Sequence, residues 1–261
     1  MEPIAATALE KVIELTGVAV ASSDSPDVAL IEGIDWEISA GDYWVVAGRP
    51  GVGKRELLAV AGGQNRPLAG AVRLFGREVS GLGGDEWLPE RLRVGFVFDE
   101  GGRLFNQLTV EQNLALPLCY HRDCEAGDVA GEVREILELT GLTAQARSFP
   151  GRLNLAWRQR VALARALALR PDVLLLDNPL SGAQGRHVSW WLDFLARLSA
   201  GQAGVSDRPA TLIVCAEHFN PWSAHARRFG LLRDHRLEQL GGRAEVEGRE
   251  DFWLPEPTAA G

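Results

Sequence analysis

A glycine-rich segment between an apolar run and a helical pattern constrains the fold of this chain more than any other feature. Residues 43–46 are typical of a buried strand, residues 48–54 have the spacing GxxxxGK, and a helical Glu-Leu-Leu follows at 56–58. This order predicts a phosphate-binding loop, in which backbone N–H groups at a helix N-terminus surround phosphate oxygens. The predicted nucleotide-binding residues are Gly48, Arg49, Pro50, Gly51, Val52, Gly53, Lys54, Arg55 and Glu56.

Lysine usage supports this prediction. Lys11 and Lys54 are the only lysines among 27 basic residues, so arginine is the ordinary cation of this chain. A lysine ammonium is a compact, mobile charge that can reach the β- and γ-phosphates of a nucleotide, a role that the planar fork of arginine fits poorly. Lys54 is therefore the residue expected to bind these phosphates.

The residue after the lysine departs from the usual pattern. A serine or threonine hydroxyl normally binds Mg²⁺ there, and this chain has Arg55. Arginine cannot coordinate a cation, and two interpretations stay open. Arg55 either abolishes metal-dependent binding, or its guanidinium neutralises phosphate charge in place of the metal.

Composition excludes several other classes. The chain has 261 residues, 46 % of them hydrophobic, and a net charge of −8, which argues against a general nucleic-acid binder. No apolar run approaches the ~20 residues that cross a bilayer, and no signal peptide is visible. Three cysteines in a chain of this size are typical of a reducing cytoplasm. We therefore expect a cytoplasmic protein without a nucleic-acid partner.

Alternating strand and helix patterns predict an α/β fold with a largely parallel sheet. Strand-like runs at 12–20, 29–38 and 43–46 predict an antiparallel opening that leads into a core. Near-continuous apolar runs at 172–177 and 211–215 are typical of central strands covered on both faces. Between about 104 and 170 the pattern is helical, and 201–209 is expected to be a loop. Within the helical region, one face is formed by Val129, Val133, Ile136 and Leu137, and Gly141 is expected to end that helix.

Further segments resemble the ATP-binding cassette (ABC) family, the nucleotide-binding subunits of ABC transporters. These segments are residues 105–118, 159–167 and 174–182, and the resemblance extends from about 11 to 240. It implies a P-loop NTPase fold: a RecA-like core, an N-terminal antiparallel β subdomain and an inserted helical subdomain at about 104–160. Residues 241–261 are then expected to be a C-terminal tail.

The resemblance also implies roles that the chain fills only in part. Asp177 stands at the aspartate position that contacts Mg²⁺, and Asp99, at the glutamine-loop position, is a second candidate metal ligand. Asn178 replaces the catalytic glutamate, and a neutral amide cannot act as a general base. The switch histidine falls at Glu217, with His218 one residue late. No catalytic residue is assigned, and ATP is the expected ligand, with the use of Mg²⁺ left open.

The motifs that family members lend to a partner subunit are altered too. The signature motif aligns with Leu153-Asn154-Leu155-Ala156-Trp157, and the D-loop aspartate aligns with Gln184. The adenine-stacking aromatic aligns near Ala21. Because both the chain's own site and its signature are altered, we expect ATP hydrolysis to be slow or absent.

The resemblance implies an ATP-binding subunit that works with an integral-membrane permease and dimerises with itself or with another ABC subunit. Such a subunit is expected to be peripheral, at the cytoplasmic face of the inner membrane. Residues 101–118 look most like members that move phospholipids, of the lipid-asymmetry and Mce-associated kind. The alternative is a pseudo-ATPase that acts as a structural or regulatory partner of a membrane complex.

Two other clusters are interpreted as structural. Cys119, His121 and Cys124 are close in sequence, but three ligands without a fourth do not form a tetrahedral metal set. Trp190 and Trp191 are expected to be core residues of a helix.

Overall fold

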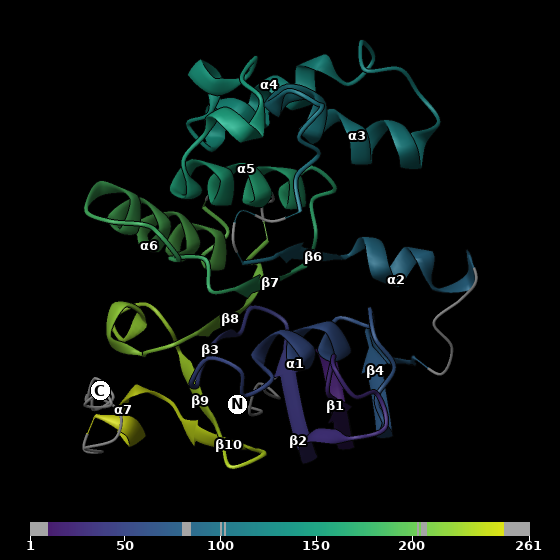
Figure 1. Cartoon of the computed structure of the whole chain (residues 1–261), viewed down its shortest axis with the longest axis vertical. Helices are drawn as coiled ribbons and strands as arrows, with labels where there is room; N and C mark the ends of the chain where they lie inside the picture. The colour runs from purple at the N-terminus through teal and green to yellow at the C-terminus, as the bar shows by residue number, and fades with distance from the viewer. Residues whose placement is uncertain are drawn as a thin grey trace, which may run out of the picture.

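The computed structural model describes residues 10–79, 85–99, 101, 103–202, 204 and 208–247. A central mixed sheet lies between an antiparallel sheet and a group of helices (Figure 1). The strands of the antiparallel sheet lie within residues 11–78, and the helical group lies within residues 110–167. The predicted α/β class, with its N-terminal antiparallel subdomain and helical part, is confirmed.

The antiparallel sheet has the strand order β2-β1-β4-β5. Strands β1 (Lys11–Ala21) and β2 (Ala29–Ser39) are the two predicted runs. Alternate residues of β2 are buried and exposed between Ile34 and Ile38, as expected for a sheet with one covered face. Strands β4 (Ala69–Leu74) and β5 (Arg77–Glu78) complete the sheet.

The central sheet has the order β10-β9-β3-β8-β7-β6. Its strands are β3 (Tyr43–Ala47), β6 (Val94–Val97), β7 (Val173–Asp177), β8 (Thr211–Ala216), β9 (Arg228–Arg233) and β10 (Arg236–Gly241). All pairs are parallel except β9–β10. Every residue of β3, β7 and β8 is buried, and β7 and β8 confirm the central strands predicted from the continuous apolar runs at 172–177 and 211–215. Residues 43–46, expected to belong to the antiparallel opening, lie instead in β3 of the central sheet, where they pair in parallel with β8 and β9.

The helical part consists of α3 (Val110–Arg122), α4 (Ala130–Leu139) and α5 (Leu155–Leu167). A capping box between Thr109 and Gln112 begins α3. Val133 and Leu137 are buried on α4, as the periodicity predicts, and Gly141 follows with φ of 65°. These helices have a hydrophobic cluster of their own, and α5 also packs against β6 of the central sheet.

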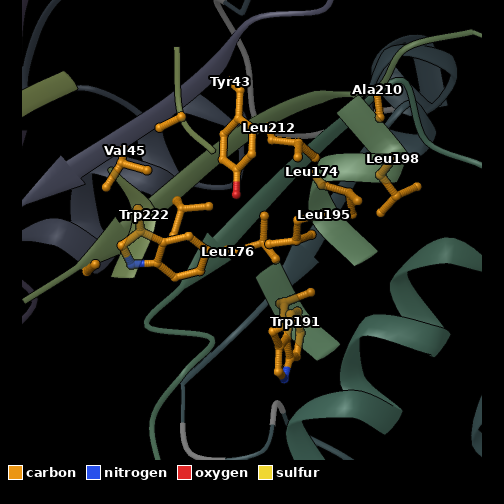
Figure 2. Close-up of a cluster of buried hydrophobic side chains, with 14 of the residues drawn as sticks. Tyr43, Val45, Leu174, Leu176, Trp191, Leu195, Leu198, Ala210, Leu212 and Trp222 are labelled. Atoms are coloured by element: carbon orange, nitrogen blue, oxygen red, sulfur yellow. The ribbon is translucent and has the colours of Figure 1, made fainter. Parts of the chain in front are cut away.

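Helix α6 (Arg186–Ser199) covers one face of the central sheet. Its Trp191, Leu195 and Leu198 lie in one cluster with Leu174 and Leu212, as Figure 2 shows. Trp191 is fully buried and Trp190 is partly buried against the same cluster. Both tryptophans are therefore core residues, as predicted.

The remaining helices are α1 (Lys54–Ala61), α2 (Leu88–Leu92) and α7 (Arg243–Val246). Since β10 ends at Gly241 and α7 follows, regular structure continues into the segment expected to be a tail. Residues 248–261 lie outside the described residues, as does part of the expected loop at 201–209. No helix in the described ranges has the length and apolarity that a membrane span requires.

Candidate nucleotide site

The glycine-rich loop joins the central strand β3 to helix α1. At Gly48, a Cβ atom would lie 2.6 Å from the backbone oxygen of Leu232. Gly53 has φ of 99°, and its Cβ would lie 2.8 Å from Cδ2 of Leu30. Both positions exclude a side chain, one by contact with backbone and the other by conformation and contact together. The loop path therefore requires the glycines of the sequence pattern.

Helix α1 begins without a side-chain cap. Gly53 is the N-cap residue and makes no side-chain hydrogen bond to the first turn. The first N–H groups of a helix have no acceptor within the helix, and the helix dipole favours negative charge at this end. The start of α1 is therefore suited to bind an anion.

Lys54 lies folded against the loop. Its side chain is buried, and Nζ donates to the carbonyl oxygens of Gly48 and of Arg49, the latter at 2.8 Å. Phosphate oxygens are charged acceptors and form stronger hydrogen bonds than peptide carbonyls. The ammonium is thus held at the loop by acceptors that an anion can replace.

An open pocket of about 280 Å³ lies beside the loop. It brings together residues from α1 and from the ends of β6, β7 and β8. The lining residues are Pro50, Gly51, Gly53, Lys54, Arg55, Glu56, Asp99, Asp177, Asn178 and Glu217. Of the two residues aligned with the switch position, Glu217 lines the pocket and His218 does not.

Arg55 and Asp177 form an ion pair in this pocket. Nε of Arg55 donates to Oδ2 of Asp177 over 3.1 Å, and the side chains are 54 % and 8 % exposed. Burial raises the pKa of Asp177, and the bond to Arg55 opposes that rise. The same bond raises the pKa of Arg55. The guanidinium is therefore the cation that compensates the buried carboxylate.

Asn178 and Asp99 form a second hydrogen-bonded pair in this pocket. Nδ2 of Asn178 donates to Oδ2 of Asp99 over 3.3 Å, and Nε2 of Gln159 lies 3.5 Å from Oδ1 of Asp99. Asn178 has φ of 44°, a left-handed conformation that asparagine tolerates better than most residues. Both residues contribute polar groups to the pocket, and the amide of Asn178 cannot act as a general base.

These groups do not fit Mg²⁺ as they are arranged. Hard cations prefer oxygen ligands, and at the hydroxyl position the chain has the cationic side chain of Arg55. The carboxylate of Asp177 is already bonded to that cation, while Asp99 accepts from amides. A Mg²⁺ ion bound to Asp177 would either displace the guanidinium from this carboxylate or lie beside its positive charge.

The signature position has a different chemistry from the loop. Asn154 caps α5 by accepting from the N–H of Trp157 at 3.0 Å. The ring of Trp157 meets His187 edge-on at 5.1 Å, and the guanidinium of Arg160 lies 4.8 Å from the Trp157 ring and 3.7 Å from the Trp190 ring. Burial lowers the pKa of Arg160 to about 10. Sequence reasoning missed this cluster, because His187 and Trp190 come from another helix.

The positions predicted for the D-loop aspartate and for the adenine-stacking aromatic differ in their surroundings. Gln184 is exposed before α6, and Ala21 is half-buried at the end of β1. Near Ala21, Oγ of Ser23 donates to Oε1 of Glu56 over 2.5 Å, which ties this loop to α1. Within the described residues, no group of three His, Cys, Asp or Glu side chains could hold a metal.

A phosphate loop after a central strand, an aspartate at the end of the next strand but one, an antiparallel sheet and a helical subdomain define a P-loop cassette. A family model described as "ABC transporter" matches residues 31–181. The chain belongs to this family, which confirms the resemblance at that level.

Curated relatives agree with this membership. The chain is 35 % identical over 181 residues to a methionine import ATP-binding protein of Rhizobium etli, covering 69 % of this chain and 49 % of the relative. It is 36 % identical over 209 residues to a sulfate/thiosulfate import ATP-binding protein of Chromobacterium violaceum, covering 80 % and 53 %. The chain thus spans about half the length of these relatives.

Solved structures share the fold. The dimeric cassette MJ0796 in a post-hydrolysis state bound to ADP and Pi has a TM-score of 0.77 at 24 % identity, covering 88 % of this chain and 99 % of that one. CbiO1 from Clostridium perfringens, part of an ABC transporter complex, has a TM-score of 0.75 at 21 % identity, covering 91 % and 90 %.

Proposed function

We propose that this chain is the ATP-binding subunit of an ABC transporter and binds ATP in the pocket beside the glycine-rich loop. The observation that carries this proposal is the joint position of the uncapped start of α1 and the buried Lys54 at one pocket. The loop amides and the ammonium are the groups that surround phosphates in such loops. The nine residues from Gly48 to Glu56 are the proposed nucleotide contacts.

We propose that hydrolysis is slow or absent. The side chain that follows Asp177 is the amide of Asn178, which donates to Asp99 and cannot accept a proton from water. Loss of a positioned general base costs about 10²–10⁴ in rate. Glu217 lines the pocket and is a carboxylate that could polarise a water there. No step is assigned to a metal, because the arrangement of Arg55 and Asp177 does not accommodate one.

The partners follow from family membership and are proposals for this chain. An integral-membrane permease would supply the membrane span, and this chain would bind to it at the cytoplasmic face of the membrane. A second cassette would complete a dimer. The lipid substrate expected from residues 101–118 has no support among the relatives above, which are named for methionine and for sulfate/thiosulfate import. Of that segment, Gly102 lies outside the described residues. Import of a small polar solute is therefore the better-supported substrate class.

A second candidate function is a pseudo-ATPase that serves as a structural or regulatory partner. The signature position favours it. Leu155 and Trp157 lie in the segment aligned with the family signature, and Trp157 packs with Arg160 and His187, so large side chains occupy the segment that family members press onto a partner's nucleotide. Such a surface would bind a partner subunit without contributing to its phosphate site.

Isothermal titration of the purified chain with ATP tests the proposal. We expect micromolar affinity, about −8 kcal/mol, and an ATPase rate close to background in the same preparation. Sedimentation with and without ATP then tests dimerisation. No heat of binding with or without Mg²⁺ would exclude the ATP-binding proposal and favour the structural role.

A further inference from the structure

We propose that Arg55 takes the place of the metal ion, so that this chain binds a nucleoside triphosphate in its metal-free form. The guanidinium would neutralise the terminal phosphates that a divalent cation otherwise bridges. This inference rests on the proposed ATP-binding function and adds the chemical form of the ligand and the residue that selects it.

The position of Arg55 is the first support. It follows Lys54 directly in the first turn of α1, lines the pocket, and is fixed by a 3.1 Å bond from Nε to the buried carboxylate of Asp177. Because Asp177 comes from the end of β7, the bond joins α1 to the central sheet at the pocket floor. A long side chain is thereby held in one orientation beside the loop.

The hydrogen-bonding capacity of the guanidinium is the second support. A guanidinium has five N–H donors, and the bond to Asp177 uses the one on Nε. Within the described part of the chain, the terminal nitrogens of Arg55 have no protein acceptor, and half of the side chain is exposed to the pocket. Two terminal N–H groups in a plane match two phosphate oxygens, which is the arrangement of bidentate arginine–phosphate recognition.

The charges around Arg55 explain why the metal would be excluded. The carboxylate that would bind a metal, Asp177, already has its compensating cation, and Lys54 adds a second positive charge next to it. Magnesium demands near-octahedral oxygen ligation, and the guanidinium bonded to Oδ2 of Asp177 places a positive charge beside the carboxylate that would ligate the metal. A magnesium–nucleotide complex must therefore bind with the metal against a fixed arginine, or lose the metal.

The experiment is titration of the full chain with ATP, once in Mg²⁺ and once in EDTA, for the wild type and Arg55→Thr. We expect the wild type to bind at least as tightly in EDTA as in Mg²⁺. Arg55→Thr should bind about tenfold or more weakly in EDTA and recover with Mg²⁺, because it regains a hydroxyl ligand and frees Asp177. Arg66→Thr, on the exposed segment after α1, is the matched loss of one arginine and should behave as the wild type.

Mn²⁺ provides a readout that does not depend on turnover. With ATP and protein together, the electron paramagnetic signal of free Mn²⁺ should decrease further with Arg55→Thr than with the wild type. Thermal melts of both proteins verify that the variant is folded, and Arg55→Lys keeps the charge if threonine is not tolerated.

The outcomes separate the two proposals. Wild-type binding that needs Mg²⁺ and is lost in EDTA would overturn the role of Arg55 and leave the ATP-binding function standing. Equal metal dependence of the wild type and Arg55→Thr would overturn it too. Absence of wild-type binding in both buffers would remove the ATP-binding function itself, and this inference with it.

Discussion

Nδ2 of Asn178 donates a hydrogen bond to Oδ2 of Asp99 over 3.3 Å, and this bond joins the residues that follow two neighbouring parallel strands, β7 and β6. The Arg55–Asp177 pair lines the same pocket, and the buried Gln159 places Nε2 3.5 Å from Oδ1 of Asp99. Paired charges and amides thus line the pocket. Each group already has a partner, so any reaction there must compete with an existing contact.

Restoring the family residues at positions 55 and 178 should raise the rate of ATP hydrolysis. We expect Arg55→Thr combined with Asn178→Glu to increase the ATPase rate in Mg²⁺ by at least ~10²-fold over the wild type, because a general base is regained and Asp177 is released. Each single variant should gain much less. The left-handed φ of 44° at residue 178 should cost the glutamate variant about 1 kcal/mol of stability. Steady-state phosphate release measures the rates, and a double variant as slow as the wild type would instead make residues 154–157 limiting.

Loss of the loop lysine should remove nucleotide binding. We expect Lys54→Ala to weaken ATP binding by more than tenfold, because the ammonium is the buried cation of the loop. The other lysine offers a matched control: Lys11 pairs with Glu14 and Glu37 on the surface of β1, and Lys11→Ala should keep the wild-type affinity. Calorimetric titration of both variants compares them, and unchanged affinity in Lys54→Ala would contradict the loop assignment.

The glycines of the loop differ in what a side chain would meet. Gly51 and Gly53 both have positive φ, 81° and 99°, but only at Gly53 would a Cβ atom reach a neighbour, 2.8 Å from Cδ2 of Leu30. We expect Gly51→Ala to lower the free energy of unfolding by about 1 kcal/mol through backbone strain alone. Gly53→Ala should cost roughly 1–3 kcal/mol more through overpacking. Urea unfolding of the pair gives the difference, and equal losses would mean that the contact relaxes without cost.

Stability should depend on pH through His187. Burial lowers the pKa of this imidazole, as do the charges of Arg160 and Arg186, so the folded state binds fewer protons than the unfolded chain. Stability then decreases as the pH falls below about 6.5 and levels off below the folded pKa. In the neutral form, Nδ1 accepts from Nη2 of Arg160 at 3.4 Å.

The measurement compares the melting temperature at pH 7.5 and pH 5.5. His187→Gln should show a smaller decrease than the wild type, because it removes the group that is forced to stay neutral. His121→Gln, which removes an imidazole next to Tyr120 in α3, should retain the full decrease. Identical decreases in all three proteins would refute the role of His187.

Local signals in the sequence were sufficient for the framework. The spacing of Gly48 to Lys54 predicted the loop because only glycine fits its φ angles and close contacts. Continuous apolar runs predicted β7 and β8 because both faces of a central strand are covered. The periodic face of α4 and the glycine after it were predicted for the same kind of reason, since a helix repeats every 3.6 residues.

The tertiary structure decided which residues from distant segments are in contact. The sequence left two roles open for Arg55, and the 3.1 Å bond to Asp177, 122 residues away, shows which group its charge compensates. It also left both Glu217 and His218 as candidates for the switch position, and the parallel pairing of β8 with β3 and β7 places only the first in the pocket lining. Spacing along the chain determines backbone conformation, which is local. The partners of a charge depend on which strand ends meet, and that is determined by sheet order.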